Sequence, residues 1–239
     1  MIYIKEYGTK KSCTNYVKLL LEYNFKDAVV LSNILGSKHK DYLPDLFEDK
    51  KHWMKEVKTD LLDNVISEAI KKSLHDDIFY VVCVKNPYAW IHSYSKFREE
   101  KKLTVAHMKP YIEIWNKSNK QWIKELLIKK PTKSTYIKYE DLIETPEEEL
   151  IRIQKKFRMQ KKHNFKNFIS KKFRFKFNRL RNGTDVRGIK NIFLFRRFTK
   201  KNFYKKKEYL DIFNKRMLQE INDNVDPFIM DYFKYTVEK

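Results

Sequence analysis

The chain has few cysteines and no long apolar run, and both absences exclude classes of protein. Its 239 residues include only two cysteines, Cys13 and Cys83, and their spacing is not that of a zinc site or a disulfide framework. No apolar run is long enough to cross a membrane, and no signal peptide precedes the first strand-like segment. We therefore expect a cytoplasmic protein with neither a metal site nor a membrane span.

The sequence also lacks the two best-known glycine-rich nucleotide-binding motifs. In the P-loop of nucleoside triphosphatases, G-x-x-x-x-G-K-[ST], a second glycine and a lysine follow the first glycine at fixed spacing. Counted from Gly8, those two positions hold Cys13 and Thr14. The dinucleotide-binding pattern G-x-G-x-x-G is missing as well. A kinase that uses ATP and magnesium is therefore disfavoured.

Positive charge is abundant, with a formal net charge of +21 that indicates anionic partners. It is most concentrated from Arg152 to Lys207, where Asp185 is the single acid and phenylalanines are interleaved. Basic residues with interleaved aromatics can form a nucleic-acid surface, but this segment matches no named nucleic-acid-binding module. An acidic glycan, or simple solvation of the protein, would explain the charge equally well.

The first 22 residues predict a phosphate-binding turn. An apolar strand at Ile2–Ile4 and an apolar helix from Tyr16 to Leu21 flank a polar loop. That loop consists of Gly8, Thr9, Lys10, Lys11, Ser12, Cys13, Thr14 and Asn15. The start of a helix offers N–H groups and partial positive charge to an anion, and the lysines and hydroxyls of the loop add further donors. The alternative is an ordinary strand–turn–helix with surface lysines.

A second unit of the same kind follows at Phe79–Val84, a continuous apolar run typical of a strand buried on both faces. Lys85 follows the strand directly, Pro87 suits the first turn of a helix, and Ser93 lies on that helix. Because the carboxyl ends of parallel strands open onto one crevice, the two units should lie side by side. Together they suit a ligand with two separate phosphate-type groups.

With these residues the chain resembles the sulfotransferases that use 3′-phosphoadenosine 5′-phosphosulfate (PAPS). The family's phosphosulfate loop, roughly G-x-x-[KR]-S-G-T-[TN], corresponds to Gly8–Asn15. Its 3′-phosphate site, roughly R-[ND]-P with a later serine, corresponds to Lys85–Pro87 and Ser93. A third similarity is Tyr139–Leu142, the Y-E-D-L element, with the helix that follows it. The matches occur in family order within residues 1–155.

Two positions depart from the family pattern. Cys13 stands where the family usually has glycine, so its side chain narrows the available backbone angles. Lys85 stands where the family usually has arginine, so a point charge replaces a planar fork that can hold phosphate through two parallel bonds. If both changes disable the site, the chain would be an inactive sulfotransferase-like scaffold that binds nucleic acid or another polyanion.

The resemblance implies PAPS as cosubstrate, 3′-phosphoadenosine 5′-phosphate (PAP) as product, and no metal. It implies two catalytic residues, with His39, after a predicted strand at Ala28–Leu35, as the base and Lys11 offsetting charge on the leaving oxygen. It also suggests a late basic loop that closes over the nucleotide. The implied cofactor-binding residues are Gly8, Lys10, Lys11, Ser12, Cys13, Thr14, Asn15, Lys85, Ser93, Arg187, Gly188 and Lys190.

We therefore expect a single α/β domain over 1–239, with a mostly parallel sheet flanked by helices. Residues 1–155 would form its core, and 156–239 a basic, mainly helical part. Helices are expected at 61–70 and 110–130, the latter with a buried aromatic stripe, and a capping box is expected at Thr145 and Glu148. The acceptor would carry a hydroxyl or amine. An anionic glycan is the favoured acceptor, and nucleic acid binding through 152–207 is the alternative.

Overall fold

The computed structural model describes residues 2–26, 28–31, 37–42, 78–162, 164 and 201–238. Three of the expected nucleotide-binding residues, Arg187, Gly188 and Lys190, lie outside the described residues. So do the helix expected at 61–70 and most of the basic segment.

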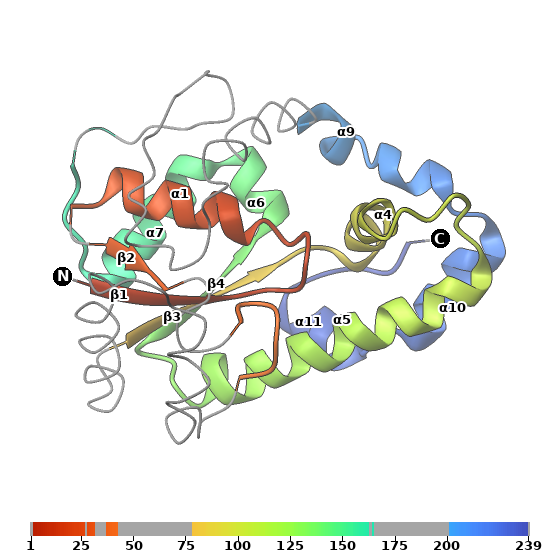
Figure 1. Cartoon of the computed structure of the whole chain (residues 1–239), viewed down its shortest axis with the longest axis horizontal. Coiled ribbons are helices and arrows are strands. Elements are labelled where there is room, and N and C mark those ends of the chain that lie inside the picture. Colours follow the sequence, from red (N-terminus) through yellow and green to blue (C-terminus); the bar gives the residue numbers. More distant parts are fainter. Residues whose placement is uncertain are drawn as a thin grey trace, which may run out of the picture.

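A parallel sheet forms the centre of the described structure. Its strands are β1 (Ile2–Tyr7), β2 (Ala28–Val30), β3 (Ile78–Val84) and β4 (Ser134–Lys138). Their order is β2-β1-β3-β4, and every neighbouring pair is parallel. The predicted α/β fold with a parallel sheet is confirmed. Since all four strands run the same way, the segments that follow them emerge at one edge of the sheet (Figure 1).

One face of the sheet is covered by α1 (Thr14–Asn24) and α7 (Pro146–Phe157), with the short α6 (Tyr139–Glu144) beside them (Figure 1). Apolar residues of α1 and α7 pack against alternate residues of the central strands. This core includes Ile4, Val17, Leu20, Leu21, Val81, Cys83, Leu150 and Ile153. Burial of these side chains holds α1 in place, and with it the loop that connects it to β1.

The opposite face is covered by α5 (Met108–Trp122), which continues as a π-helical segment η2 (Ile123–Ile128). Trp115 and Trp122 are fully buried against the sheet, so the aromatic stripe expected in this helix is core. The helices α10 (Lys215–Asn224) and α11 (Pro227–Tyr232) pack against α5 on this face. Two other short helices from the end of the chain pack elsewhere: η5 (Glu208–Ile212) contacts α4, and α9 (Lys201–Lys205) contacts α6.

The helix after β3, α4 (Pro87–Phe97), begins as its sequence predicts. Pro87 occupies the first turn, and the Asn86 side chain accepts a hydrogen bond from the Tyr88 N–H at 3.1 Å. The capping box expected at Thr145 is wrong, because the Thr145 hydroxyl caps nothing in α7. It donates instead to the Asp141 carbonyl at 3.4 Å, since α6 ends at the same residue.

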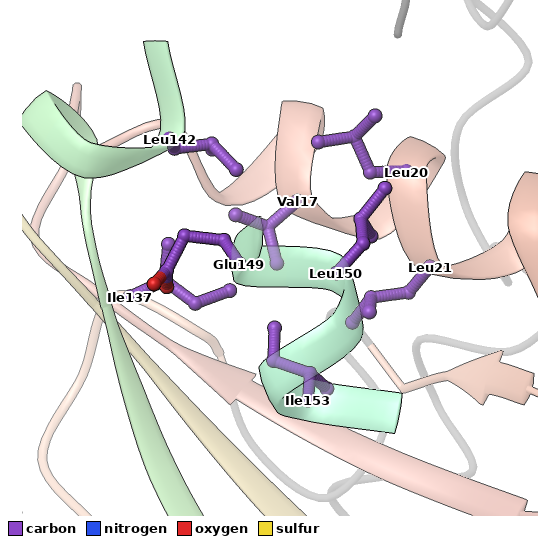
Figure 2. Close-up of a pocket in the computed structure, with 8 residues that line it drawn as sticks. All are labelled: Val17, Leu20, Leu21, Ile137, Leu142, Glu149, Leu150 and Ile153. Carbon is purple, nitrogen blue, oxygen red and sulfur yellow. The ribbon is translucent and has the colours of Figure 1, made fainter. Parts of the chain in front are cut away.

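An apolar crevice separates α1 from α7 and β4 (Figure 2). It is lined by Val17, Leu20, Leu21, Ile137, Leu142, Leu150, Ile153 and Glu149. Glu149 is its one charged residue, and a carboxylate oxygen of Glu149 lies 2.7 Å from the guanidinium of Arg152. The crevice is therefore a packing seam and not a site for an anionic ligand. Within the described residues, no helix is long and apolar enough to span a membrane.

Candidate functional site

The loop between β1 and α1 turns tightly against β3. A Cβ added at Gly8 would lie 2.4 Å from the Ser12 hydroxyl and 2.8 Å from the Cys83 carbonyl oxygen, so only glycine fits. The Ser12 hydroxyl donates to the Thr9 carbonyl at 2.7 Å, and the Ser12 N–H donates to the same oxygen at 3.1 Å. Ser12 thus fixes the shape of the loop from within.

Two residues of the loop have left-handed backbone conformations, Lys11 at φ 73° and Cys13 at φ 70°. Cys13 is the residue before the first turn of α1, and its carbonyl accepts hydrogen bonds from Tyr16 N–H at 2.8 Å and Val17 N–H at 3.1 Å. The N–H groups of Thr14 and Asn15 donate to no acceptor among the described residues. They are the donors that a helix start presents to an anion.

The charged side chains of the loop lie on its outer side. Lys10 and Lys11 are both exposed, and their ammonium groups lie 5.3 Å and 4.8 Å from the ring centroid of Phe97 at the end of α4. The structure therefore gathers all of the predicted loop residues from Gly8 to Asn15 around the start of α1. Lys10 and Lys11 stand at the solvent side, within the positive field of that helix end.

The structure also brings together the two side chains of the second predicted site, Lys85 and Ser93. The Lys85 ammonium donates to the Ser93 hydroxyl at 2.8 Å, so the end of β3 and the helix α4 contribute one residue each. A third side chain joins them from α9: the Tyr204 hydroxyl lies 3.1 Å from Lys85 Nζ and 3.1 Å from Ser93 Oγ. The rings of Tyr139 and Tyr204 each have their centroids 4.2 Å from Lys85 Nζ.

The charge of Lys85 is buried without a directly paired carboxylate. Only 2% of the residue is exposed, and among the described residues no carboxylate oxygen forms a salt bridge with it. The acid that influences it is Glu140, whose carboxylate accepts from Asn86 N–H and from the Tyr235 hydroxyl, both at 3.0 Å. Burial raises the pKa of Glu140. The direct hydrogen-bond partners of the Lys85 ammonium are therefore two neutral hydroxyl groups, and a buried cation of this kind could be compensated by an anion.

The helix α4 connects the loop to the Lys85 pair. The indole N–H of Trp90 donates to the Lys10 carbonyl at 2.8 Å, and Ser93 follows less than one turn later on the same helix. The indole N–H of Trp115 in α5 donates to the Lys85 carbonyl at 3.0 Å. These bonds fix the two donor groups relative to each other at the carboxyl edge of adjacent strands β1 and β3.

His39, the candidate base, lies beside the loop. Its Nδ1 is 2.6 Å from the Gly8 carbonyl oxygen, which can only accept, so Nδ1 carries the proton. The other ring nitrogen, Nε2, is then left with a lone pair. Burial lowers the pKa of His39 below its ordinary value, more than the bond to Gly8 raises it. Neutral histidine, the form that can accept a proton, is therefore favoured near pH 7.

Lys38 anchors the segment that carries His39. Its carbonyl accepts from the Gly8 N–H at 3.0 Å, and its ammonium donates to the Glu6 carboxylate at 3.2 Å. The same ammonium donates to the Asn15 side-chain oxygen in the first turn of α1. Because both partners belong to the β1–loop–α1 unit, His39 is held against the loop from two sides.

Sequence reasoning missed three residues of this arrangement. Tyr204 follows Lys85 by 119 positions and belongs to no motif, so nothing in the sequence marks it. Glu6 and Trp90 have indirect signals, as the single acid of an otherwise mostly apolar strand and as the first tryptophan after Pro87. Within the described ranges, no three His, Cys, Asp or Glu side chains come together as a metal-binding group.

The sequence matches no protein-family model and no curated protein. Among solved structures, the fold is similar to the sulfotransferase domain from the curacin biosynthetic pathway. The TM-score is 0.51 and the sequence identity 14%, over 99% of this chain and 98% of that one. The sulfotransferase domain from the Synechococcus PCC 7002 olefin synthase aligns with a TM-score of 0.37 and 12% identity, over 99% of this chain and 83% of that one. The chain thus has a sulfotransferase-like α/β fold.

Proposed function

We propose that this protein is a PAPS-dependent sulfotransferase. The observation that carries the proposal is the pair of donor groups at the ends of adjacent strands, the Gly8–Asn15 loop and Lys85 with Ser93. Each is suited to an anion, and α4 fixes their relation through Trp90 and Ser93. A nucleotide with phosphate groups at both its 5′ and 3′ positions has the matching charge pattern.

PAPS supplies a sulfuryl group on an anhydride whose cleavage leaves a phosphate. In this proposal the first turn of α1 and the loop hold the 5′ end, where the helix start and Lys11 stabilise negative charge on the departing phosphate. Lys85 and Ser93 hold the 3′-phosphate. Since Lys85 is buried and its hydrogen-bond partners are hydroxyl groups, its charge is less screened by solvent than that of a surface lysine.

His39 is the proposed base. The Gly8 carbonyl holds the proton on Nδ1 and so leaves Nε2 to take a proton from an acceptor hydroxyl or amine. The lowered pKa of His39 keeps the ring neutral and ready to accept a proton at physiological pH. Lys38, paired with Glu6, orients the segment without taking part in proton transfer. The net charge of +21 favours an anionic acceptor, with an acidic glycan as the leading class.

The test is a calorimetric titration of the protein with PAP, with ATP–magnesium as the control ligand. The proposal predicts micromolar binding of PAP and much weaker binding of ATP–magnesium. Lys11→Ala should weaken PAP binding roughly 10-fold or more, because a charged hydrogen bond or contact is lost. Lys155→Ala, which removes the same charge from the exposed far end of α7, is the matched control and should change nothing. Equal effects of the two variants would instead indicate nonspecific attraction by a basic surface.

A further inference from the structure

Helix α9 brings a third polar group, the Tyr204 hydroxyl, to the Lys85–Ser93 pair. Tyr204 Oη is 3.1 Å from both Lys85 Nζ and Ser93 Oγ, and those two atoms are 2.8 Å apart. Three polar atoms at nearly equal separations form a triangle. An oxygen placed above such a triangle lies within hydrogen-bond distance of all three corners.

The triangle suits a phosphate oxygen because it combines one buried cation with two hydroxyl groups. The Lys85 ammonium carries three protons, of which two go to the other corners, so the third can be donated to an anion. The Ser93 hydroxyl donates to the Ala89 carbonyl at 3.0 Å, whereas the Tyr204 hydroxyl can turn about its C–O bond and direct its proton toward an anion. Within the described structure no salt bridge joins Lys85 to a carboxylate, and Glu140, the acid that acts on Lys85 electrostatically, is hydrogen-bonded to the Asn86 N–H and the Tyr235 hydroxyl instead.

Contacts other than its hydroxyl hold Tyr204 in this place. Its ring packs edge-on against Tyr139 with centroids 4.9 Å apart, and it lies 5.9 Å from the ring of Tyr209. The next residue, Lys205, forms an ion pair with Glu144 at 3.3 Å. Removal of the hydroxyl alone should therefore leave α9 docked on α6.

We propose that Tyr204 is a specificity-determining residue that binds the 3′-phosphate of the nucleotide together with Lys85 and Ser93. This inference rests on the proposed function. It makes the C-terminal part of the chain a component of the nucleotide site, because α9 supplies a ligand that neither β3 nor α4 contains. It also predicts that the Tyr204 hydroxyl strengthens the binding of only those nucleotides that carry a 3′-phosphate.

The experiment compares PAP with adenosine 5′-phosphate, which lacks the 3′-phosphate, by calorimetry. Tyr204→Phe keeps the ring and removes the hydroxyl, and it should weaken PAP binding roughly 10-fold while leaving adenosine 5′-phosphate binding unchanged. Tyr209→Phe is the matched control, since its hydroxyl makes no hydrogen bond within the described structure, and it should affect neither ligand.

Unchanged or tighter PAP binding by Tyr204→Phe would overturn this inference and leave the proposed function standing. Failure of the wild-type protein to bind PAP would overturn both. If Tyr204→Phe does not fold, nitration of Tyr204 in the wild-type protein, followed by mass spectrometry, gives the decision. PAP should slow that nitration and adenosine 5′-phosphate should not, and equal rates with the two nucleotides would overturn the inference.

Discussion

Replacement of His39 by asparagine distinguishes the structural role of Nδ1 from the proposed catalytic role of Nε2. The asparagine amide nitrogen can donate to the Gly8 carbonyl as Nδ1 does at 2.6 Å, but nothing remains at the position of Nε2. Nucleotide binding should therefore stay within a factor of about two, whereas sulfuryl transfer should slow roughly 10²–10⁴-fold, the usual contribution of a general base. That factor corresponds to about 3–5 kcal/mol in the activation barrier.

The assay is the release of PAP from PAPS as a function of pH, with an acceptor alcohol, amine or water receiving the sulfuryl group. In the wild-type protein the rate should fall at acid pH as His39 becomes protonated. Because burial lowers the pKa of His39 from its ordinary 6.5, the midpoint of this fall should lie below that pH. His39→Asn should lack this acid limb. His39→Gln, which restores a polar atom near Nε2 but loses the contact with Gly8, serves as the comparison.

The same lowered pKa predicts an effect on stability that needs no acceptor. The folded protein takes up the proton on His39 at lower pH than the unfolded chain does, so the unfolded chain binds more protons in that range. The free energy of unfolding should therefore decrease as the pH falls through 6.5, and the decrease should be smaller in His39→Asn. Full transfer activity in His39→Asn, or an unchanged acid limb, would refute the assignment of His39 as the base.

Two further predictions concern the loop itself. Gly8→Ala should lower the free energy of unfolding by about 1–3 kcal/mol and weaken PAP binding, because the new methyl group would lie 2.8 Å from the Cys83 carbonyl oxygen. Urea unfolding measures the first effect and calorimetry the second. Unchanged stability and binding would contradict the close packing at Gly8. Cys13→Gly should raise the free energy of unfolding by up to about 1 kcal/mol, because glycine adopts φ 70° without the strain of a Cβ. Cys13→Ala keeps that strain and should show no such gain. Equal stabilities of the two variants would argue against strain at this position.

Local patterns were sufficient to predict the two strand–loop–helix units. The apolar run of β3 ends at Lys85 and Pro87 starts α4, and the structure has these features at the predicted positions. Because the strands are parallel, the Gly8 loop and Lys85 both lie at the carboxyl end of the sheet. This proximity can be predicted from strand direction alone. The structure places His39 beside Gly8, while its role as the base remains a prediction.

Long-range packing explains what the sequence did not predict. Tyr204 reaches Lys85 only because α9 docks on α6, and no periodicity or spacing encodes that contact over 119 residues. The capping box at Thr145 fails for a local reason, because the end of α6 offers the hydroxyl an earlier partner in the Asp141 carbonyl. The buried carboxylate of Glu6 is paired with the ammonium of Lys38, which lies 32 residues later in the sequence.

In the proposed function, one nucleotide bridges the Gly8–Asn15 loop and Lys85. The most direct test is the ratio of dissociation constants for adenosine 5′-phosphate and PAP, measured for the wild-type protein and for Lys85→Met. The account predicts that the wild-type protein prefers PAP roughly 10- to 100-fold and that Lys85→Met loses this preference while still binding adenosine 5′-phosphate. A ratio that is the same in both proteins would show that Lys85 does not bind the 3′-phosphate, and would contradict the account.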